Sequence, residues 1–283
     1  MIQLMEMAKT AVISYRTATS SLRLSPDFII IGTARSGTTS LYNYLVRHPN
    51  VAPALMKEVH FFDCHYQKGI SWYHSQFPSI PYKYYTETIR RRTLITGEAS
   101  PYYMFHPYVP ERMAALLPNV KLIALLRNPV ERVFSHYCWE VGWGNEKFSL
   151  EEAIEHEEKR IRVDMKKLAT GDSFNHRHFS YLARSMYVDQ LERWLQYFPR
   201  KQLLLIKSEE LYAEPERIFK ETLAFLHLPN DAKILNNRYK QYNKQKYPVP
   251  QQMAPETRRR LVEIFMSPNE RLYKLVDRNF GWQ

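Results

Sequence analysis

Short apolar runs alternate with longer polar or amphipathic segments along the chain. The runs at residues 28–31, 94–96, 122–126 and 203–206 are three to five residues long and mostly apolar. Runs of this kind are typical of strands that are buried on both faces of a parallel sheet. The alternation of such runs with helical segments therefore predicts an α/β fold, in which helices flank a central parallel sheet.

Helical segments are marked by apolar residues at a spacing of three and four. This pattern occurs at residues 39–46, 187–198, 215–226 and 255–265, and each segment has a proline at its start or just beyond its end. Ser149, followed three residues later by Glu152, predicts a capping box. The helix that begins there is highly charged and is expected to run to about residue 168 with a mostly solvated surface.

The first apolar run leads into a glycine-containing loop, in the sequence FIIIGTARSGTTSL at residues 28–41. Such a strand-loop-helix unit directs backbone N–H groups at one point and predicts an anion site in a P-loop-like sheet. Gly32 and Gly37 have the Walker A spacing, but Thr38 stands where that loop has a lysine. An ordinary nucleoside triphosphatase is therefore not expected, and Arg35 becomes the cation for a phosphate group. The alternative is a plain strand-to-helix connection.

A second anion site is indicated by KLIALLRNPVERVFSHY at residues 121–137. Arg127 follows the apolar run, and Ser135 lies about two helical turns further on. Because ligands of parallel α/β sheets bind at the carboxyl ends of the strands, Arg127 and the loop at 32–40 are expected to face one crevice. Alternatively, Arg127 pairs with Glu131 at a helix start.

Composition supports a globular protein with an anionic partner. Of the 283 residues, 45% are hydrophobic and 24% charged, which excludes a disordered chain or a coiled coil. The net charge of +11 is consistent with a nucleotide, an acidic glycan, an acidic lipid surface or a nucleic acid as partner, or with a merely basic surface. The only two cysteines, Cys64 and Cys138, form no framework of disulfides or metal ligands, so a reducing compartment is expected.

The N-terminal residues do not have the pattern of a signal peptide, because Glu6, Lys9 and Arg16 interrupt every apolar run. No stretch approaches the roughly 18 apolar residues of a membrane span. A cytoplasmic location is therefore expected. Residues 1–25 are interpreted as a lead-in helix or a tail, and residues 26–283 as a single domain.

Several segments together resemble the sulfotransferases that use 3'-phosphoadenosine 5'-phosphosulfate (PAPS), most closely the heparan sulfate N- and 3-O-sulfotransferase branch, with this chain as a bacterial-type relative. From residue 26 onward the resemblance covers nearly the whole chain in order. It is carried by GTARSGTTSL (32–41), KEVHFFD (57–63), YQKGISWYHSQFP (66–78), GEASPYY (97–103), LLRNPVERVFSHY (125–137), SMYVDQLERWLQYFPRKQLLLI (185–206) and PETRRRLVEIFMSPNERLYKLVDRNFGW (255–282).

The resemblance implies a function and a set of site residues. PAPS would be the cosubstrate and PAP the product, with no metal, and Glu58 would take the proton of an acceptor hydroxyl or amine beside His60. Arg127 and Ser135 would hold the 3'-phosphate, and Arg35 would stabilise the departing phosphate oxygen. Lys240, Lys244 or Lys246, in a loop at 236–250, would cover the nucleotide. The 5'-phosphosulfate would lie on Thr33, Ala34, Arg35, Ser36, Gly37, Thr38, Thr39 and Ser40.

The chain departs from the family pattern at several positions. Arg35 replaces the usual loop lysine, and Ala99 replaces the lysine of the EKSP motif, which weakens the expectation of a heparan-type acceptor. No cysteine follows Cys138, so the C-terminal disulfide of the animal enzymes is absent. An anionic polysaccharide or another polar metabolite is the expected acceptor, and nucleic acid is not expected. Candidate acceptor residues are His106, His176, Arg177, His178 and Arg184, although residues 170–184 are equally interpreted as an ordinary polar loop.

Two rival functions are compatible with parts of the sequence. A P-loop kinase-like phosphoryl transferase would explain the glycine spacing, but it lacks the loop lysine and a magnesium-binding aspartate after a strand. A non-enzymatic polyanion-binding module would use the arginine runs at 90–92 and 258–260, which are more often solvated surface.

Overall fold

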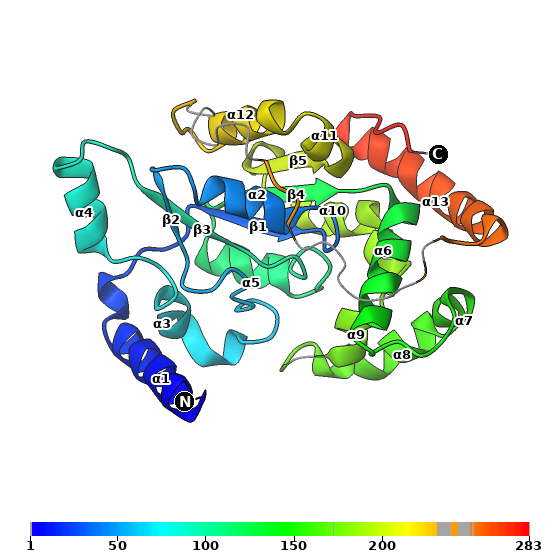
Figure 1. The fold of residues 1–283 in the computed structure, drawn as a ribbon, viewed down its shortest axis with the longest axis horizontal. Helices are drawn as coiled ribbons and strands as arrows, with labels where there is room; N and C mark the ends of the chain where they lie inside the picture. Colours follow the sequence, from blue (N-terminus) through cyan, green and yellow to red (C-terminus); the bar gives the residue numbers. More distant parts are fainter. Residues whose placement is uncertain (1, 172, 231–238, 243–249, 251, 283) are drawn as a thin grey trace.

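A five-stranded parallel sheet forms the centre of the molecule (Figure 1). A computed structural model describes residues 2–171, 173–230, 239–242, 250 and 252–282 of the chain. The strands are β1 (Phe28–Gly32), β2 (Val51–Pro53), β3 (Ile95–Ala99), β4 (Lys121–Leu126) and β5 (Leu203–Lys207), in the order β2-β3-β1-β4-β5. The four predicted runs are confirmed as strands, and β2 was missed because it has three residues and ends in a proline, which only an edge strand tolerates.

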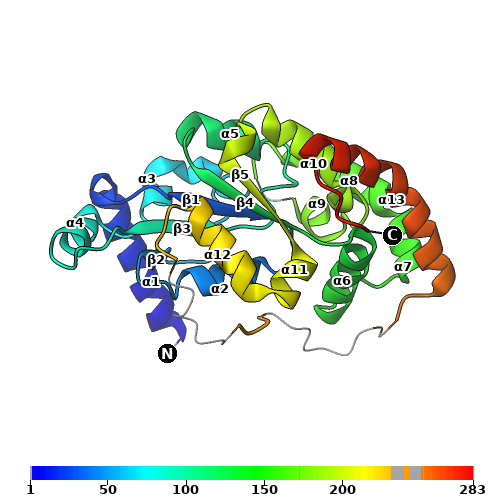
Figure 2. The same cartoon turned by 90° about the horizontal axis from the view of Figure 1, so that it is seen from above.

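Helices cover both faces of the sheet (Figures 1 and 2). One face packs on α3, α5, α10 and α13, and the other on α2, α11 and α12. The prediction of an α/β sheet flanked by helices is confirmed. The helices are α1 (Ile2–Ala18), α2 (Thr38–Leu45), α3 (Gly69–His74), α4 (Ile80–Thr88), α5 (Val109–Leu116), α6 (Pro129–Gly142), α7 (Leu150–Glu155), α8 (Glu157–Asp164), α9 (Phe174–His178), α10 (Tyr187–Leu195), α11 (Ser208–Ala213), α12 (Pro215–Phe225) and α13 (Pro255–Val276), with 3-10 turns η1 (Ser20–Leu22), η2 (Tyr66–Lys68), η3 (Met165–Lys167), η4 (Ala183–Ser185) and η5 (Arg200–Gln202).

The charged helix after residue 149 differs from its prediction. The capping box of Ser149 and Glu152 is present, and most residues of 149–168 are exposed as predicted, but the helix divides into α7 and α8. Glu157 is buried and accepts hydrogen bonds from the backbone N–H groups of Leu182 (2.7 Å) and Ala183 (2.8 Å). A buried carboxylate needs such donors, so α8 serves as a support for the segment at 182–185.

The N-terminal residues form helix α1, the first of the two predicted alternatives. The Arg16 guanidinium attaches the end of this helix to the domain by donating to the carbonyl oxygens of Ser75 (2.5 Å) and Phe77 (2.6 Å). Helix α13 extends beyond its predicted end at residue 265 and continues through Pro268. Within the described residues, no helix combines the length and the apolar character that crossing a bilayer requires.

Candidate functional site

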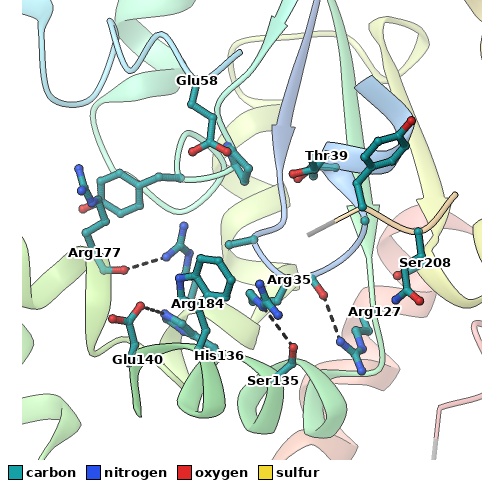
Figure 3. A pocket seen from close by; sticks show the side chains of 18 of the residues that line it. Arg35, Thr39, Glu58, Arg127, Ser135, His136, Glu140, Arg177, Arg184 and Ser208 are labelled. Atoms are coloured by element: carbon teal, nitrogen blue, oxygen red, sulfur yellow. Dashed lines mark hydrogen bonds and ion pairs between the residues drawn. The ribbon is translucent and has the colours of Figure 1, made fainter. Parts of the chain in front are cut away.

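A cleft of about 610 Å³ opens at the carboxyl ends of the parallel strands (Figure 3). Its walls include the segments that follow all five strands, as expected for a parallel α/β sheet. The lining residues are Ala34, Arg35, Gly37, Thr38, Thr39, Glu58, His60, Pro101, Tyr102, Arg127, Ser135, His136, Trp139, Glu140, Arg177, His178, Arg184, Ser208, Glu209, Tyr212, Gln241 and Tyr242.

The loop between β1 and α2 has the conformation of a tight anion-binding turn. Gly37 caps α2 with φ 94°, and a Cβ atom there would lie 2.8 Å from the Tyr212 hydroxyl, so only glycine fits. The hydroxyls of Thr33 and Ser36 bond to each other at 2.6 Å, and Thr33 also donates to the carbonyl of Leu125. These two residues and Ser40 are buried and do not line the cleft. Their hydroxyls therefore support the loop from behind.

The two predicted anion sites meet in this cleft. Arg35 Nε donates to Ser135 Oγ at 3.2 Å, and Arg127 Nη1 donates to the carbonyl of Arg35 at 3.2 Å (Figure 3). The Arg35 guanidinium also lies 4.3 Å from the centre of the Trp139 ring. Burial, together with the charge of Arg127, lowers the pKa of Arg35 to about 10, so it remains charged at neutral pH. The alternative pairing of Arg127 is not formed, because Glu131 pairs with Arg258 at 2.7 Å.

The predicted covering loop reaches the cleft in its described part. The backbone N–H of Tyr242 donates to Ser40 Oγ at 3.0 Å, and Tyr242 and Gln241 line the cleft beside the β1–α2 loop. Lys240 is exposed and does not line the cleft. Lys244 and Lys246 lie outside the described residues.

Glu58 lies on the opposite side of the cleft from Arg127, on an irregular segment after β2 (Figure 3). His60, on the same segment, also lines the cleft. His60 Nε2 lies 3.4 Å from Glu58, and His60 Nδ1 bonds to the buried Asp63 at 2.7 Å. Burial opposes the charged imidazole, but Asp63 and Glu58 outweigh it and raise the pKa of His60 to about 10. Burial likewise opposes the Glu58 carboxylate, but His60 and Lys57 outweigh it and lower its pKa to about 2.

Lys57 is a site residue that the sequence analysis missed. Its ammonium donates to Thr39 Oγ1 at 3.0 Å and also pairs with Glu58. Its carbonyl accepts from the backbone N–H of Ala99 at 3.0 Å. The Lys57 backbone is therefore held beside the end of β3, and its ammonium joins Glu58 to the β1–α2 loop.

Glu98, at the end of β3, supports the segment with Glu58 from below. It is fully buried and accepts hydrogen bonds from Ser100 (2.6 Å), Tyr73 (2.9 Å), Tyr103 (3.0 Å) and the backbone N–H of Val59 (3.2 Å). Burial raises the pKa of Glu98 to about 7 in spite of these donors. The carboxyl group thus anchors the segment that carries the Glu58 side chain.

The third wall of the cleft carries two cationic side chains near an acid. Glu140 pairs with His178 Nδ1 (2.9 Å) and His136 Nε2 (3.4 Å), and Arg177 Nε donates to His178 Nε2 at 3.3 Å. Arg184 is buried, donates to the carbonyl of Arg177 at 2.9 Å, and has no hydrogen-bond partner at Nε among the described residues. Such a guanidinium beside a cleft has unused capacity to bind an anion.

Two of the five candidate acceptor residues do not reach the cleft. His106 and His176 are buried behind Tyr102, whose hydroxyl bonds to His176 Nδ1 at 2.6 Å. Burial lowers the pKa of His106 to about 4 and that of His176 to about 3, so both are neutral core groups. Arg177, His178 and Arg184 do line the cleft. Further lining residues that were not among the predicted site residues are His136, Trp139, Glu140, Ser208, Glu209 and Tyr212, although Ser208 and Glu209 directly follow a predicted strand.

Comparison with known proteins finds matches that cover most of the chain. The model of the sulfotransferase domain family matches residues 25–267. A membrane-associated sulfotransferase of Dictyostelium discoideum is 30% identical over 91% of the chain, which spans 66% of that protein. The human heparan sulfate glucosamine 3-O-sulfotransferase 6 is 28% identical over 92% of the chain and 74% of its own length. The crystal structure of a sulfotransferase from Alicyclobacillus acidocaldarius has a TM-score of 0.67 and 29% identity, and the match covers 91% of this chain and 98% of that one.

Proposed function

The chain belongs to the sulfotransferase family, and from this membership we propose that it transfers the sulfuryl group of PAPS to a hydroxyl or amine of an acceptor, with Glu58 as the general base. One observation carries the proposal. A single cleft holds Glu58 on one side and Arg35, Arg127 and Ser135 on the other. This is the arrangement that a donor with two phosphate groups and an adjacent acceptor would require.

The nucleotide side of the cleft has two cationic points. The β1–α2 loop directs the N-terminus of α2 into the cleft, which favours the 5'-phosphosulfate. Arg127 and Ser135 are available for the 3'-phosphate, since within the described part of the chain the Arg127 side chain bonds to the carbonyl of Arg35 alone and the Ser135 hydroxyl to the Arg35 side chain alone. Binding of the 3'-phosphate would free Arg35 to turn toward the sulfuryl group.

The chemistry assigned to the cleft is an in-line transfer. The acceptor oxygen or nitrogen forms a bond to sulfur, the bond between sulfur and the phosphate oxygen breaks, and Glu58 takes the acceptor proton. Glu58 is ionised at neutral pH and can receive that proton. Arg35, Lys57 and the loop N–H groups stabilise the negative charge that develops on the departing phosphate oxygen.

His60 and Asp63 position the base in this proposal. The imidazolium lies between the two carboxylates, with bonds of 3.4 Å to Glu58 and 2.7 Å to Asp63. Asp63 is fully buried, so it fixes the ring firmly, and the ring in turn fixes the Glu58 carboxylate. His60 also lines the cleft and contacts the acceptor side of the site.

The proposed acceptor is a glycan or another polar metabolite, with an anionic polysaccharide as the leading candidate. Arg177 and Arg184 bring two guanidinium groups to the third wall, and among the described residues Glu140 is the acid on this wall, where it bonds to His136 and His178. The printed name of the human relative refers to heparan sulfate glucosamine, which is an acidic glycan unit. Ala99 stands where the heparan sulfate branch has the lysine of its EKSP motif, and this difference argues against the same acceptor as in that branch.

Thermal unfolding with three nucleotides tests the donor site. We expect PAP to stabilise the chain without metal, by about 2.7 kcal/mol at 100 times its dissociation constant, and ADP to stabilise it less. ATP with magnesium is the control for a kinase-like site. A response to ATP with magnesium alone would contradict the proposal, and so would the absence of any response to PAP. Release of PAP from PAPS, measured with acceptor glycans, then tests the transfer itself.

A further inference from the structure

Exposed apolar side chains gather at the end of the molecule formed by α1, η1 and α4. This end, defined as residues 2–25 and 79–93, is called the α1/α4 end here. Among the described residues, 21 large hydrophobic side chains are exposed, and nine of them lie at this end. They are Met7, Val12, Tyr15, Leu22, Ile80, Tyr82, Tyr84, Tyr85 and Ile89. Such a concentration on a folded protein marks an interaction surface.

The two segments are fastened to each other by one stretch of chain. Arg16 donates to the carbonyls of Ser75 and Phe77, and the backbone N–H of Leu24 donates to Pro78 at 2.9 Å. An isolated β-bridge joins Arg23 to Ser79, the residue that caps α4. Both views of the ribbon place α1 and α4 at the same end of the molecule (Figures 1 and 2). The two segments that carry the nine side chains therefore lie at one end of the molecule.

Helix α4 contributes almost nothing to the core. Thr86 is its only buried residue, whereas Tyr84 is 69% exposed and Ile89, just after the helix, is 66% exposed. A helix that presents tyrosine and isoleucine to solvent loses the burial that normally stabilises a short helix. These side chains have the amphipathic character of groups that lie at the boundary between water and lipid.

The same end is strongly basic. Residues 2–25 and 79–93 contain seven basic and two acidic residues, a net charge of +5 out of +11 for the whole chain. Arg90, Arg91 and Arg92 directly follow α4 and are exposed, and Arg90 lies 5.5 Å from the centre of the Tyr85 ring. One of the two acids, Glu87, is already paired with Lys83. The arginine run at 90–92 is therefore the part of this charge that is available to an anionic surface.

We propose that the α1/α4 end binds the surface of an anionic lipid bilayer, with its apolar side chains at the interface and its arginines on the headgroups. A second copy of the chain fits less well, because two faces of charge +5 would repel each other. A dissolved polyanion would satisfy the arginines but would not remove Met7, Val12 or Ile89 from water. A bilayer satisfies both kinds of group at once.

The orientation that follows keeps the site accessible. The α1/α4 end includes residues just before Ile95, where β3 begins, whereas the cleft lies at the carboxyl ends of the strands. A molecule held on a bilayer by this end would expose its cleft away from the point of contact. The inference does not depend on the sulfotransferase chemistry, because it uses residues outside the cleft.

Vesicle flotation with the full chain tests the proposal. The probes are vesicles of phosphatidylcholine alone and vesicles with 30% phosphatidylglycerol. We expect binding to the second kind only, with a loss at high salt. The triple variant Arg90→Gln, Arg91→Gln, Arg92→Gln should reduce partitioning by roughly 100-fold, because each of the three basic residues contributes a roughly 5-fold increase in affinity for an anionic surface. The pair Tyr84→Ser, Ile89→Ser should reduce it by roughly 10-fold.

A second arginine run provides the matched control. Arg258, Arg259 and Arg260 are also exposed but lie on α13, so their triple change to glutamine removes the same charge and should leave vesicle binding nearly unchanged. Equal losses of vesicle binding in the two triple variants would overturn the proposal. Unchanged vesicle binding by the variant Tyr84→Ser, Ile89→Ser would also overturn it. Self-association in place of vesicle binding, or heparin binding without vesicle binding, would also overturn it. Unchanged thermal stabilisation by PAP verifies that each variant is folded.

Discussion

The ammonium of Lys57 donates to the hydroxyl of Thr39 at 3.0 Å and so connects the proposed base segment to the proposed phosphate loop. The two residues come from different loops of the sheet, one after β2 and one at the start of α2. The same ammonium pairs with Glu58. Lys57 is therefore in contact with both the proposed base and the proposed phosphate loop.

Lys57→Ala should lower kcat by about 10-fold to 100-fold and weaken PAP binding by less than 10-fold. The kinetic loss is expected because a preorganised cation near a developing charge acts mainly on the transition state. Steady-state rates and PAP titrations measure the two effects. Lys83→Ala, which removes a lysine remote from the cleft, is the control and should be neutral. A kcat equal to that of the control would exclude Lys57 from the reaction.

Glu58→Gln should reduce turnover by roughly 100-fold or more while PAP affinity changes little, because the amide cannot accept a proton but keeps the shape of the side chain. Single-turnover transfer and nucleotide titration measure the two quantities. The Glu140→Gln variant changes another carboxyl group of the cleft without touching the proposed base. If Glu58→Gln retained near-normal turnover, the base would be His60 or water.

Arg127→Gln should remove the preference for the 3'-phosphate. Hydrogen bonds to charged groups contribute about 1.5–3 kcal/mol, so the affinity for PAP should fall by roughly 10-fold to 100-fold. The affinity for adenosine 5'-monophosphate, which lacks that phosphate, should stay the same. Ser135→Ala should act in the same direction with a smaller effect. Equal losses for both nucleotides would mean that Arg127 only supports the loop through the Arg35 carbonyl.

Much of the fold and of the nucleotide side could be predicted from the sequence. The rule that ligands bind at the carboxyl ends of parallel strands predicted that Arg127 and the loop at 32–40 face one crevice, and in the structure Arg127 donates to the carbonyl of Arg35 in that loop. The apolar runs identified four of the five strands, because strands buried on both faces need uninterrupted apolar residues. The short β2 has too few residues for any such pattern.

Other features depend on tertiary contacts that no local pattern encodes. Glu157 has the sequence context of a solvated helix, but its side chain is buried against the segment at 182–183, whose backbone N–H groups donate to its carboxylate. Lys57 was missed because the segment around it is irregular, so periodicity does not indicate where its side chain points. His106 and His176 are polar residues of the kind that line a cleft, but both are buried behind Tyr102, which lines the cleft in their place. In each case a distant segment decides the environment.

Arg184→Gln should weaken the binding of an acidic acceptor and leave a neutral one unaffected. The guanidinium is buried and its Nε has no partner among the described residues, so an acceptor carboxylate would gain a charge-assisted bond there. With PAP bound, we expect the dissociation constant of a glucuronate-containing oligosaccharide to rise roughly 10-fold, while that of its glucose counterpart stays constant. For the variant Arg184→Lys, which retains the charge, the dissociation constant of the acidic oligosaccharide should lie between those of the unchanged chain and of Arg184→Gln. Equal weakening of both ligands would indicate a purely structural role.

The ionisation of His60 should make stability depend on pH in the alkaline range. The pKa is about 10 in the folded chain and about 6.5 in the unfolded chain, so between these values only the folded state holds the proton. The free energy of unfolding should therefore be highest below pH 6.5 on account of this group and fall by about 1.4 kcal/mol per pH unit up to about pH 10. Urea unfolding at a series of pH values measures this slope.

The variant His60→Asn isolates the contribution, because asparagine keeps a donor for Asp63 but does not titrate. Between pH 6.5 and 10, the free energy of unfolding of this variant should fall less steeply with pH, by about 1.4 kcal/mol per pH unit, which corresponds to one proton. This difference does not depend on the absolute stability of the variant. In NMR spectra of histidine-labelled protein at pH 8, His60 should be charged, whereas His136 and His176, whose pKa values burial lowers to about 3, should be neutral. A neutral His60 at pH 8 would show that Glu58 and Asp63 do not stabilise its charge, and the base would then lack the fixed cation proposed to position it.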